Sequence, residues 1–166
     1  MNNPAAITAV IARPCAQSWQ GRYVLGYGAP VDLGPLIHRL AHDAHAAHGA
    51  DGIAALASRL IDEHVCWDRI TPDGQRLGRC RCHAPGPVEV STLDAQMLTP
   101  GQPRTARYAY CLDPKGLRVE VRVNGDWLKL GGASYSRDPA GVRFDLMAAR
   151  ALELREAHAW DTDPLH

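Results

Sequence analysis

The sequence has few aromatic residues and no long hydrophobic run. Aromatic side chains make up 6% of its 166 residues, with a single phenylalanine, so Leu, Val, Ile and Ala must fill the core. The apolar stretch from Ala5 to Ala12 is too short to span a membrane, lacks a basic leader and ends at Arg13-Pro14. We therefore expect a cytoplasmic protein with no membrane partner.

A net charge is also missing, because 18 basic side chains balance 18 acidic ones. This balance disfavours a strongly electrostatic nucleic-acid binder, whose affinity depends on neutralising phosphates. Only residues 69–122 are basic, with nine basic and five acidic side chains, a net charge of +4. A nucleic-acid-binding module therefore stays as an alternative. Arginine supplies 16 of the 18 basic residues, which together with the many alanines indicates a bacterial or phage coding bias.

The motifs of common enzyme classes are missing too. The sequence has no G-x-S-x-G elbow, Walker loop, H-E-x-x-H helix or dinucleotide fingerprint. Cys82 and His83 are adjacent and would point to opposite sides of a strand, which is wrong for a nucleophile and its base. These absences favour a non-catalytic protein, although catalysis by scattered residues stays open.

The length and composition predict a single globular domain over residues 1–166. Apolar residues make up 46% and charged residues 22%, which are ordinary values for a chain that buries one core. Residues 84–103 contain four prolines and predict one long loop. Loops of this length within a domain are usually functional, so this Pro-rich loop is a predicted docking segment.

The stretch from Arg104 to Leu130 predicts a β-meander. Apolar residues alternate with charged ones at positions 117–123, as in a strand with one buried face. Asn124-Gly125 then predicts a two-residue type I′ turn. That turn sets the expected cross-strand pairs, which are Val121 with Leu128, Val119 with Leu130, Glu120 with Lys129 and Arg122 with Trp127.

Helical periodicity appears on both sides of the strands. Asp32 is an expected N-cap for a helix ending at Gly49, and Asp51 caps a second helix, so the two form an αα-hairpin. Residues 138–141 close a further hairpin or begin a helix, and we prefer the hairpin, followed by a C-terminal helix capped by Asp145. The predicted fold class is α+β: an antiparallel β-meander sheet packed against the αα-hairpin and the C-terminal helix.

This order of elements resembles the helix-grip folds, the plant-allergen and lipid-transfer-like ligand binders. The resemblance covers element order only, since no residue motif supports it. It implies a small-ligand pocket between the sheet and the C-terminal helix.

Cysteine and histidine spacing predicts a metal site around a turn. Residues 65–70 and 75–82 are β-type segments joined by Thr71-Pro72-Asp73-Gly74. If Gly74 is left-handed and Thr71 pairs with Gln75, one face of the ribbon carries three thiols and one imidazole. These groups are a zinc ligand set, and closed four-ligand zinc sites are normally structural. The predicted ligands are His64, Cys66, Cys80 and Cys82.

A second interpretation of these residues needs no metal. Free cysteines are often small buried hydrophobes, and a two-residue loop would place Cys66 opposite Arg79 and separate the cluster. His38, His42 and His45 also share one helix face. They indicate either a shared metal or a solvated polar face, since no carboxylate lies on that face.

The turn at residues 113–116 decides where two tyrosines point. The geometry assumed for the first Pro-x-Gly turn places Tyr108 and Tyr110 on the outer sheet face, with Tyr108 opposite Arg122 and Arg122 beside Trp127. Such a row would stack a base, a ring or a partner side chain. A two-residue loop instead turns both tyrosines inward. Burial favours the inward register and turn chemistry the outer row, and we adopt the outer row.

These patterns favour a small non-catalytic binding or regulatory protein. We expect it to recognise a macromolecular partner, in the first instance a protein, through its outer sheet face or the Pro-rich loop. The alternatives are a small-ligand pocket protein or enzyme of helix-grip-like architecture, and a nucleic-acid-binding module. Zinc is the one cofactor that the sequence suggests.

Overall fold

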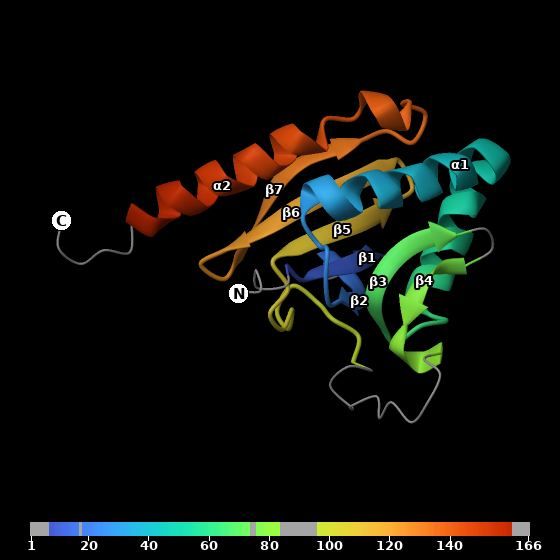
Figure 1. The fold of residues 1–166 in the computed structure, drawn as a ribbon, viewed down its shortest axis with the longest axis horizontal. Helices are drawn as coiled ribbons and strands as arrows, with labels where there is room; N and C mark the ends of the chain where they lie inside the picture. Colours follow the sequence, from blue (N-terminus) through green and yellow to red (C-terminus); the bar gives the residue numbers. More distant parts are fainter. Residues whose placement is uncertain (1–6, 17, 74–75, 84–95, 161–166) are drawn as a thin grey trace.

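The computed structural model describes residues 7–16, 18–73, 76–83 and 96–160. Within these residues, seven strands, two α-helices and two short 3-10 helices follow one another (Figure 1). In order they are β1 (Ala9–Cys15), β2 (Ser18–Val24), α1 (Pro30–Ile61), β3 (Cys66–Asp73), β4 (Arg76–Cys80), η1 (Arg81–His83), β5 (Tyr108–Asp113), β6 (Gly116–Val123), β7 (Asp126–Ala133), η2 (Pro139–Gly141) and α2 (Phe144–Trp160).

The strands form one mixed sheet in the order β4-β3-β2-β1-β5-β6-β7. Strand β1 runs parallel to β5, and β2 runs parallel to β3, whereas the remaining pairs are antiparallel. The predicted α+β class is confirmed, but the expectation of a purely antiparallel sheet is wrong. Helix α1 carries the chain from β2 to β3, which lie side by side in parallel, and β5, the next strand after β4, lies beside β1 and not beside β4.

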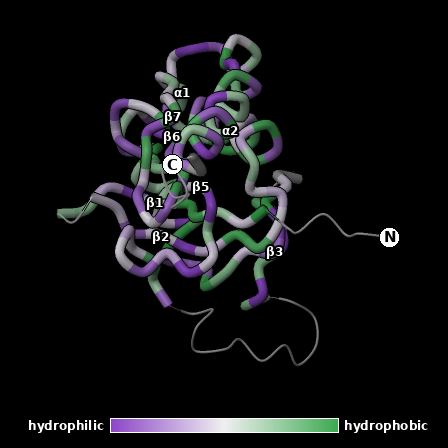
Figure 2. Tube along the Cα trace, turned by 90° about the vertical axis from the view of Figure 1, so that its left-hand side faces the viewer, coloured by the Kyte–Doolittle hydropathy of each residue, from purple (hydrophilic) through white to green (hydrophobic). Residues whose placement is uncertain are grey.

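Residues of both helices share one core with residues of the sheet, so α1 and α2 lie on the same side of it; Figure 2 shows both helices near β6 and β7, with β1, β2 and β3 below them. The predicted C-terminal helix is present as α2. In place of the expected N-terminal αα-hairpin, the structure has one long helix, α1. Helix α1 runs from Pro30 to Ile61 with a single non-helical residue, Gly49, at φ 59°. Glycine reaches positive φ without steric cost. The helical conformation is therefore interrupted at Gly49, the predicted position, and α1 continues beyond it as one bent helix. Two strands precede α1, which also departs from the helix-grip element order.

The main core fills the space between the sheet and the two helices. Its buried side chains include Ile37 and Leu60 from α1, Val119 and Val121 from β6, and Phe144 from α2. The preferred hairpin at residues 138–141, which needs a strand directly after it, is therefore wrong, since α2 begins at Phe144. The alternative that placed Asp138 at a helix start is closer, because its carboxylate accepts a hydrogen bond from the backbone N–H of Ala140 in η2.

The opposite face of the sheet, called here the outer face, is covered in part by residues 96–107. Leu98 exchanges two backbone hydrogen bonds with Gly21 of β2, and Trp127 Nε1 donates to the Pro100 carbonyl at 3.2 Å. A second buried cluster, which includes Trp19, Tyr23 and Leu98, lies on this face. The described part of the Pro-rich loop, residues 96–103, is thus held against the sheet; residues 84–95 lie outside the described residues.

The β6–β7 hairpin has the predicted turn. Asn124 and Gly125 take φ values of 50° and 97°, and the Val121–Leu128, Arg122–Trp127 and Glu120–Lys129 pairs are all present. The predicted Val119–Leu130 pair is wrong, because a register shift after Val119 places Gly131 opposite it. Such a bulge adds one residue to one strand, and the pairing beyond it moves by one position.

Candidate functional site

A group of metal-ligating side chains lies where β3 begins and β4 ends. Ligand atoms of His64, Cys80 and Cys82 all lie within 4.8 Å of one another. The Cys82 sulfur is 3.6 Å from Nδ1 of His64, whose ring packs 4.2 Å from the Trp67 ring. We call these three residues the His-Cys-Cys group. Cys80 is buried and Cys82 is exposed, so the group reaches from the core to the surface and could hold a metal ion.

The two sulfurs of this group are also in contact as a disulfide, between Cys80 and Cys82. The backbone N–H of Cys82 in addition donates to the sulfur of Cys80 at 3.3 Å. A metal is bound by thiolates, whereas a disulfide sulfur has no such charge. The group can therefore be a disulfide when oxidised or two metal-ligating thiolates when reduced, but not both at once.

The fourth predicted ligand, Cys66, does not join the group. Trp67, not Cys66, lies opposite Cys80, and Cys66 belongs to the buried cluster of the outer face. The register drifts along this ribbon, from Asp73 opposite Arg76 at the turn to Trp67 opposite Cys80. A change of one residue in register moves a side chain to the other face of a strand, which explains why the four-ligand prediction is wrong.

Two of the three helix histidines are held by hydrogen bonds to the segment after β7, and the ring of the third, His45, lies 5.8 Å from the Tyr135 ring. His38 Nε2 lies 3.0 Å from the Ser134 carbonyl, and His42 Nδ1 lies 2.6 Å from the Tyr135 carbonyl. Burial lowers the pKa of His38, which is fully inaccessible to solvent. Within the described residues these histidines do not form a metal-ligating group. They join α1 to the end of the sheet.

The predicted outer row of tyrosines is wrong. Asp113 pairs with Gly116, so the turn has two residues, and Tyr108 and Tyr110 lie opposite Val121 and Val119. Both rings belong to the main core, and the Tyr110 hydroxyl donates to the Gly28 carbonyl at 2.7 Å. Burial raises the pKa of Tyr110 well above its usual value. The burial of two large rings decides this register over turn chemistry.

Arg122 and Trp127 do lie side by side on the outer face, as predicted. Both are half-buried, and both hold down residues 96–107. Arg122 Nη1 donates to the Arg104 carbonyl at 3.0 Å, and the Trp127 ring packs edge-on against Trp19 at 5.2 Å. Their contacts explain how the covering segment is fixed, and a binding role for them stays a prediction.

A buried carboxylate on this face was not anticipated from the sequence. Glu120 is only 9% exposed. Its Oε2 accepts a hydrogen bond from Trp19 Nε1 at 3.1 Å, and its Oε1 lies 2.8 Å from Arg118 Nε. Glu120 thus joins β2 to β6 beneath the covering segment. The one signal in the sequence was an acidic residue between two arginines on a strand.

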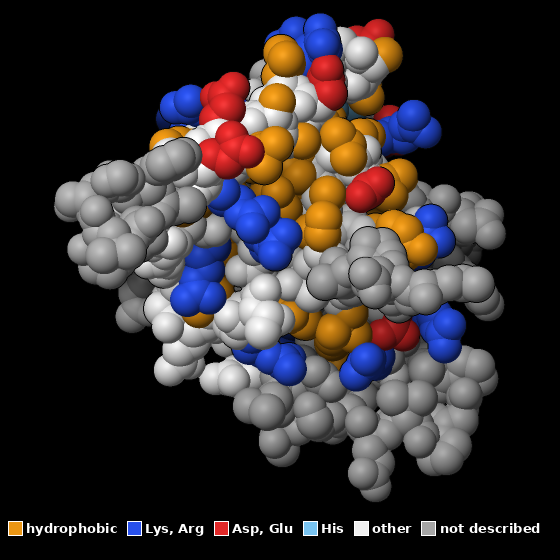
Figure 3. Space-filling view, turned by 60° about the vertical axis from the view of Figure 1, so that its left-hand side comes forward, with side chains coloured by type: hydrophobic (Ala, Val, Ile, Leu, Met, Phe, Trp, Pro, Cys, Tyr) orange, Lys and Arg blue, Asp and Glu red, His pale blue; other side chains and the backbone are white. Residues whose placement is uncertain are grey.

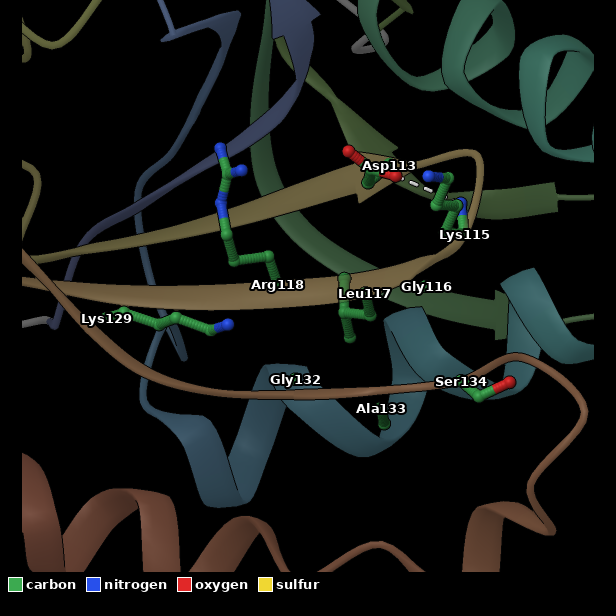
Figure 4. Close-up of a pocket in the computed structure, with 9 residues that line it drawn as sticks. All are labelled: Asp113, Lys115, Gly116, Leu117, Arg118, Lys129, Gly132, Ala133 and Ser134. Carbon is green, nitrogen blue, oxygen red and sulfur yellow. Dashed lines mark hydrogen bonds between the residues drawn. The ribbon is translucent and has the colours of Figure 1, made fainter.

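An open cavity of 330 Å³ lies at the β5–β6 turn and along β7 (Figure 4). Its lining includes Lys115, Arg118 and Lys129. This position differs from the pocket that a helix-grip fold implies, because Phe144, Met147 and Ala151 of α2 pack into the core between that helix and the sheet. The cavity therefore lies at the β5–β6 turn and beside β7, and not between the sheet and α2.

The surface shown in Figure 3 mixes all side-chain types. Hydrophobic side chains gather at its centre, with both basic and acidic side chains around them. Leu146 and Leu152, both on α2, are more than half exposed. Among the described residues visible in Figure 3, basic side chains are interspersed with acidic and hydrophobic ones, so this view adds no support to the nucleic-acid alternative.

Comparisons with known proteins identify no relative. No protein-family model, no curated protein and no solved structure matches this chain. Among the described residues, no helix has the length and apolar character needed to cross a membrane.

Proposed function

We propose that this protein is a non-catalytic binding protein that carries a zinc ion on the His-Cys-Cys group. The observation that supports this proposal is the grouping of three ligand atoms within 4.8 Å. Imidazole nitrogen and thiolate sulfur are the ligands that zinc prefers, and zinc is four-coordinate in most protein sites. Three protein ligands therefore leave one position for water or for an atom of a partner.

The open coordination position allows the zinc ion to bind a ligand atom from a partner. A structural site is closed by four protein ligands, and the loss of Cys66 from the set leaves this site one ligand short. Cys82 is exposed, so a side chain of a partner has access to an ion bound there. The proposed role is recognition of a protein partner that completes the coordination of the ion.

The proposal applies to the reduced protein. Two electrons and two protons convert the Cys80–Cys82 disulfide to two thiols, and each thiol loses its proton when it binds the metal. A reductant such as a phosphine supplies the electrons and is itself oxidised. The oxidised protein is expected to bind no zinc at this group.

Metal analysis of the reduced protein tests this function. We expect native mass spectrometry to find one zinc ion per chain after reduction and zinc addition, and none in Cys80→Ser or Cys82→Ser. Cys15→Ser is the matched control, because Cys15 is a free cysteine on β1 outside the group. Cys66→Ala is expected to keep the ion as well. A reduced wild-type chain without zinc, or equal loss in the Cys15 variant, contradicts the proposal.

A second candidate surface for the same class of function is the outer sheet face. Arg122 and Trp127 are half-buried there, and Lys129 beside them is exposed. Arginine and tryptophan are enriched among residues that dominate protein interfaces. Substitution Lys129→Glu should weaken binding of a partner that uses this face while leaving zinc content unchanged; unchanged partner affinity argues against the outer face.

A further inference from the structure

The cavity at the β5–β6 turn contains both lysines of the chain. Lys115 lies in the turn itself and Lys129 on β7, and no other lysine exists among the 166 residues. Figure 4 shows Lys115 beside Asp113 and Lys129 extended along the space between β6 and β7. A cavity of 330 Å³ falls at the lower end of the range of small-molecule sites.

The charges of the lining are unbalanced. Three basic side chains, Lys115, Arg118 and Lys129, face one acidic side chain, Asp113, which gives three minus one, a net charge of +2. Arg118 is the only one of the three with an ion-pair partner among the described residues, Glu120. Both lysine ammonium groups thus lack a carboxylate partner within the described part of the chain, although acidic and basic residues are equal in number overall.

The acidic member of the lining is already engaged by the turn. Asp113 Oδ1 accepts a hydrogen bond from the backbone N–H of Lys115 at 3.0 Å. This contact orients the carboxylate toward the turn backbone. Positive charge around a hollow with low-dielectric walls concentrates the field there, and the ammonium groups are the charges left to meet a ligand.

Glycine lets the two strands that line the cavity approach each other closely. Gly116 and Gly132 lie in its lining, and a Cβ at these positions would meet the Ala133 and Leu117 carbonyls at 2.7 Å and 2.9 Å. Close approach of β6 and β7 therefore requires glycine at both positions. The lining between the basic side chains thus includes two residues that have no side chain.

We infer that this cavity binds a small phosphate-bearing molecule. Lys115 and Lys129 contact the phosphoryl oxygens, and Arg118, positioned by Glu120, adds charge at the side. The two lysine ammonium groups without an ion-pair partner complement the two negative charges of a phosphate dianion, and their flexible stems are well suited to reach it. This inference does not depend on zinc, since the cavity and the His-Cys-Cys group share no residue.

Titration of the full chain with phosphate tests the inference. Amide spectra of the ¹⁵N-labelled protein are recorded with inorganic phosphate, with glycerol 3-phosphate and with sodium chloride at equal ionic strength. We expect both phosphates, and not chloride, to shift the amide resonances of Gly116 and Gly132 in a saturable way. A Lys115→Gln, Lys129→Gln double variant should raise the dissociation constant at least tenfold.

The matched control removes the same charge elsewhere. Arg143→Gln with Arg150→Gln also lowers the net charge by two at exposed positions and should leave the dissociation constant within twofold of wild type. Circular dichroism verifies that each variant is folded. Equal weakening in both double variants, no shift at Gly116 and Gly132, or binding of a short oligonucleotide alone would each overturn a small-molecule phosphate site.

Discussion

Replacing Glu120 with alanine should destabilise the fold by about 2–4 kcal/mol. The variant leaves the buried indole N–H of Trp19 without the acceptor that it has at 3.1 Å, a cost of about 1–3 kcal/mol. It also removes the partner of Arg118, 2.8 Å away. Because the Arg118 side chain is 30% exposed, water replaces part of that interaction, and we assign it about 1 kcal/mol.

Glutamine at the same position separates the two contributions. Glu120→Gln keeps an oxygen for Trp19 and removes only the charge, so it should cost about 1 kcal/mol. Urea unfolding followed by far-UV circular dichroism gives both values. Glu153→Ala is the control, since Glu153 is 64% exposed in its pair with Arg150 and should change stability by less than about 0.5 kcal/mol.

The refuting result is an alanine variant as stable as the glutamine variant. That outcome would mean that Trp19 Nε1 finds another acceptor or water, and that Glu120 does not join β2 to β6.

Three further changes test other parts of the structure. Tyr110→Phe removes a buried hydrogen bond to Gly28 and should cost about 1–2 kcal/mol in urea unfolding; a cost near zero would support an exposed tyrosine. Burial lowers the pKa of His38 from 6.5, so stability should be complete above pH 6.5 and fall below it, by at most about 1.4 kcal/mol per pH unit; His38→Gln should flatten that dependence, and an unchanged slope would contradict it. Gly21→Ala places a Cβ 2.1 Å from a β1 carbonyl oxygen and should lower the melting temperature sharply, whereas Gly101→Ala, with nothing within 4 Å, should not; similar melting temperatures would contradict the close approach of β1 and β2.

The sequence predicted best where a turn allows only one geometry. Asn124-Gly125 requires positive φ at two successive residues, and this requirement specifies a two-residue loop and the register beside it. The hairpin at 113–116 does not require positive φ at two successive residues. Its Pro-Lys-Gly sequence fits loops of two or three residues equally well. Burial of Tyr108 and Tyr110 then selects the register, and burial depends on helices that are distant in the sequence.

Pairing between distant segments was beyond the reach of local patterns. Strand β1 lies beside β5 and β2 beside β3 in parallel, and alternation in a strand is the same whichever neighbour it has. The sequence therefore indicated the strands but not their order. The same reason explains why Cys66 was wrongly expected to lie beside the other ligands: the sheet face on which its side chain lies depends on two register shifts between β3 and β4.

The outer face shows most clearly why the candidate sites changed. Charged residues at 118, 120 and 122 alternate with valine and leucine, and such alternation normally indicates a face in contact with water. Residues 96–107 instead cross this face, and Leu98 of this segment is buried in one cluster with Trp19 of the sheet. A segment that covers a sheet leaves no trace in the periodicity of the strands it covers. Arg122 therefore holds the covering segment and Glu120 joins β2 to β6, whereas Lys115 and Lys129 are exposed and line the cavity.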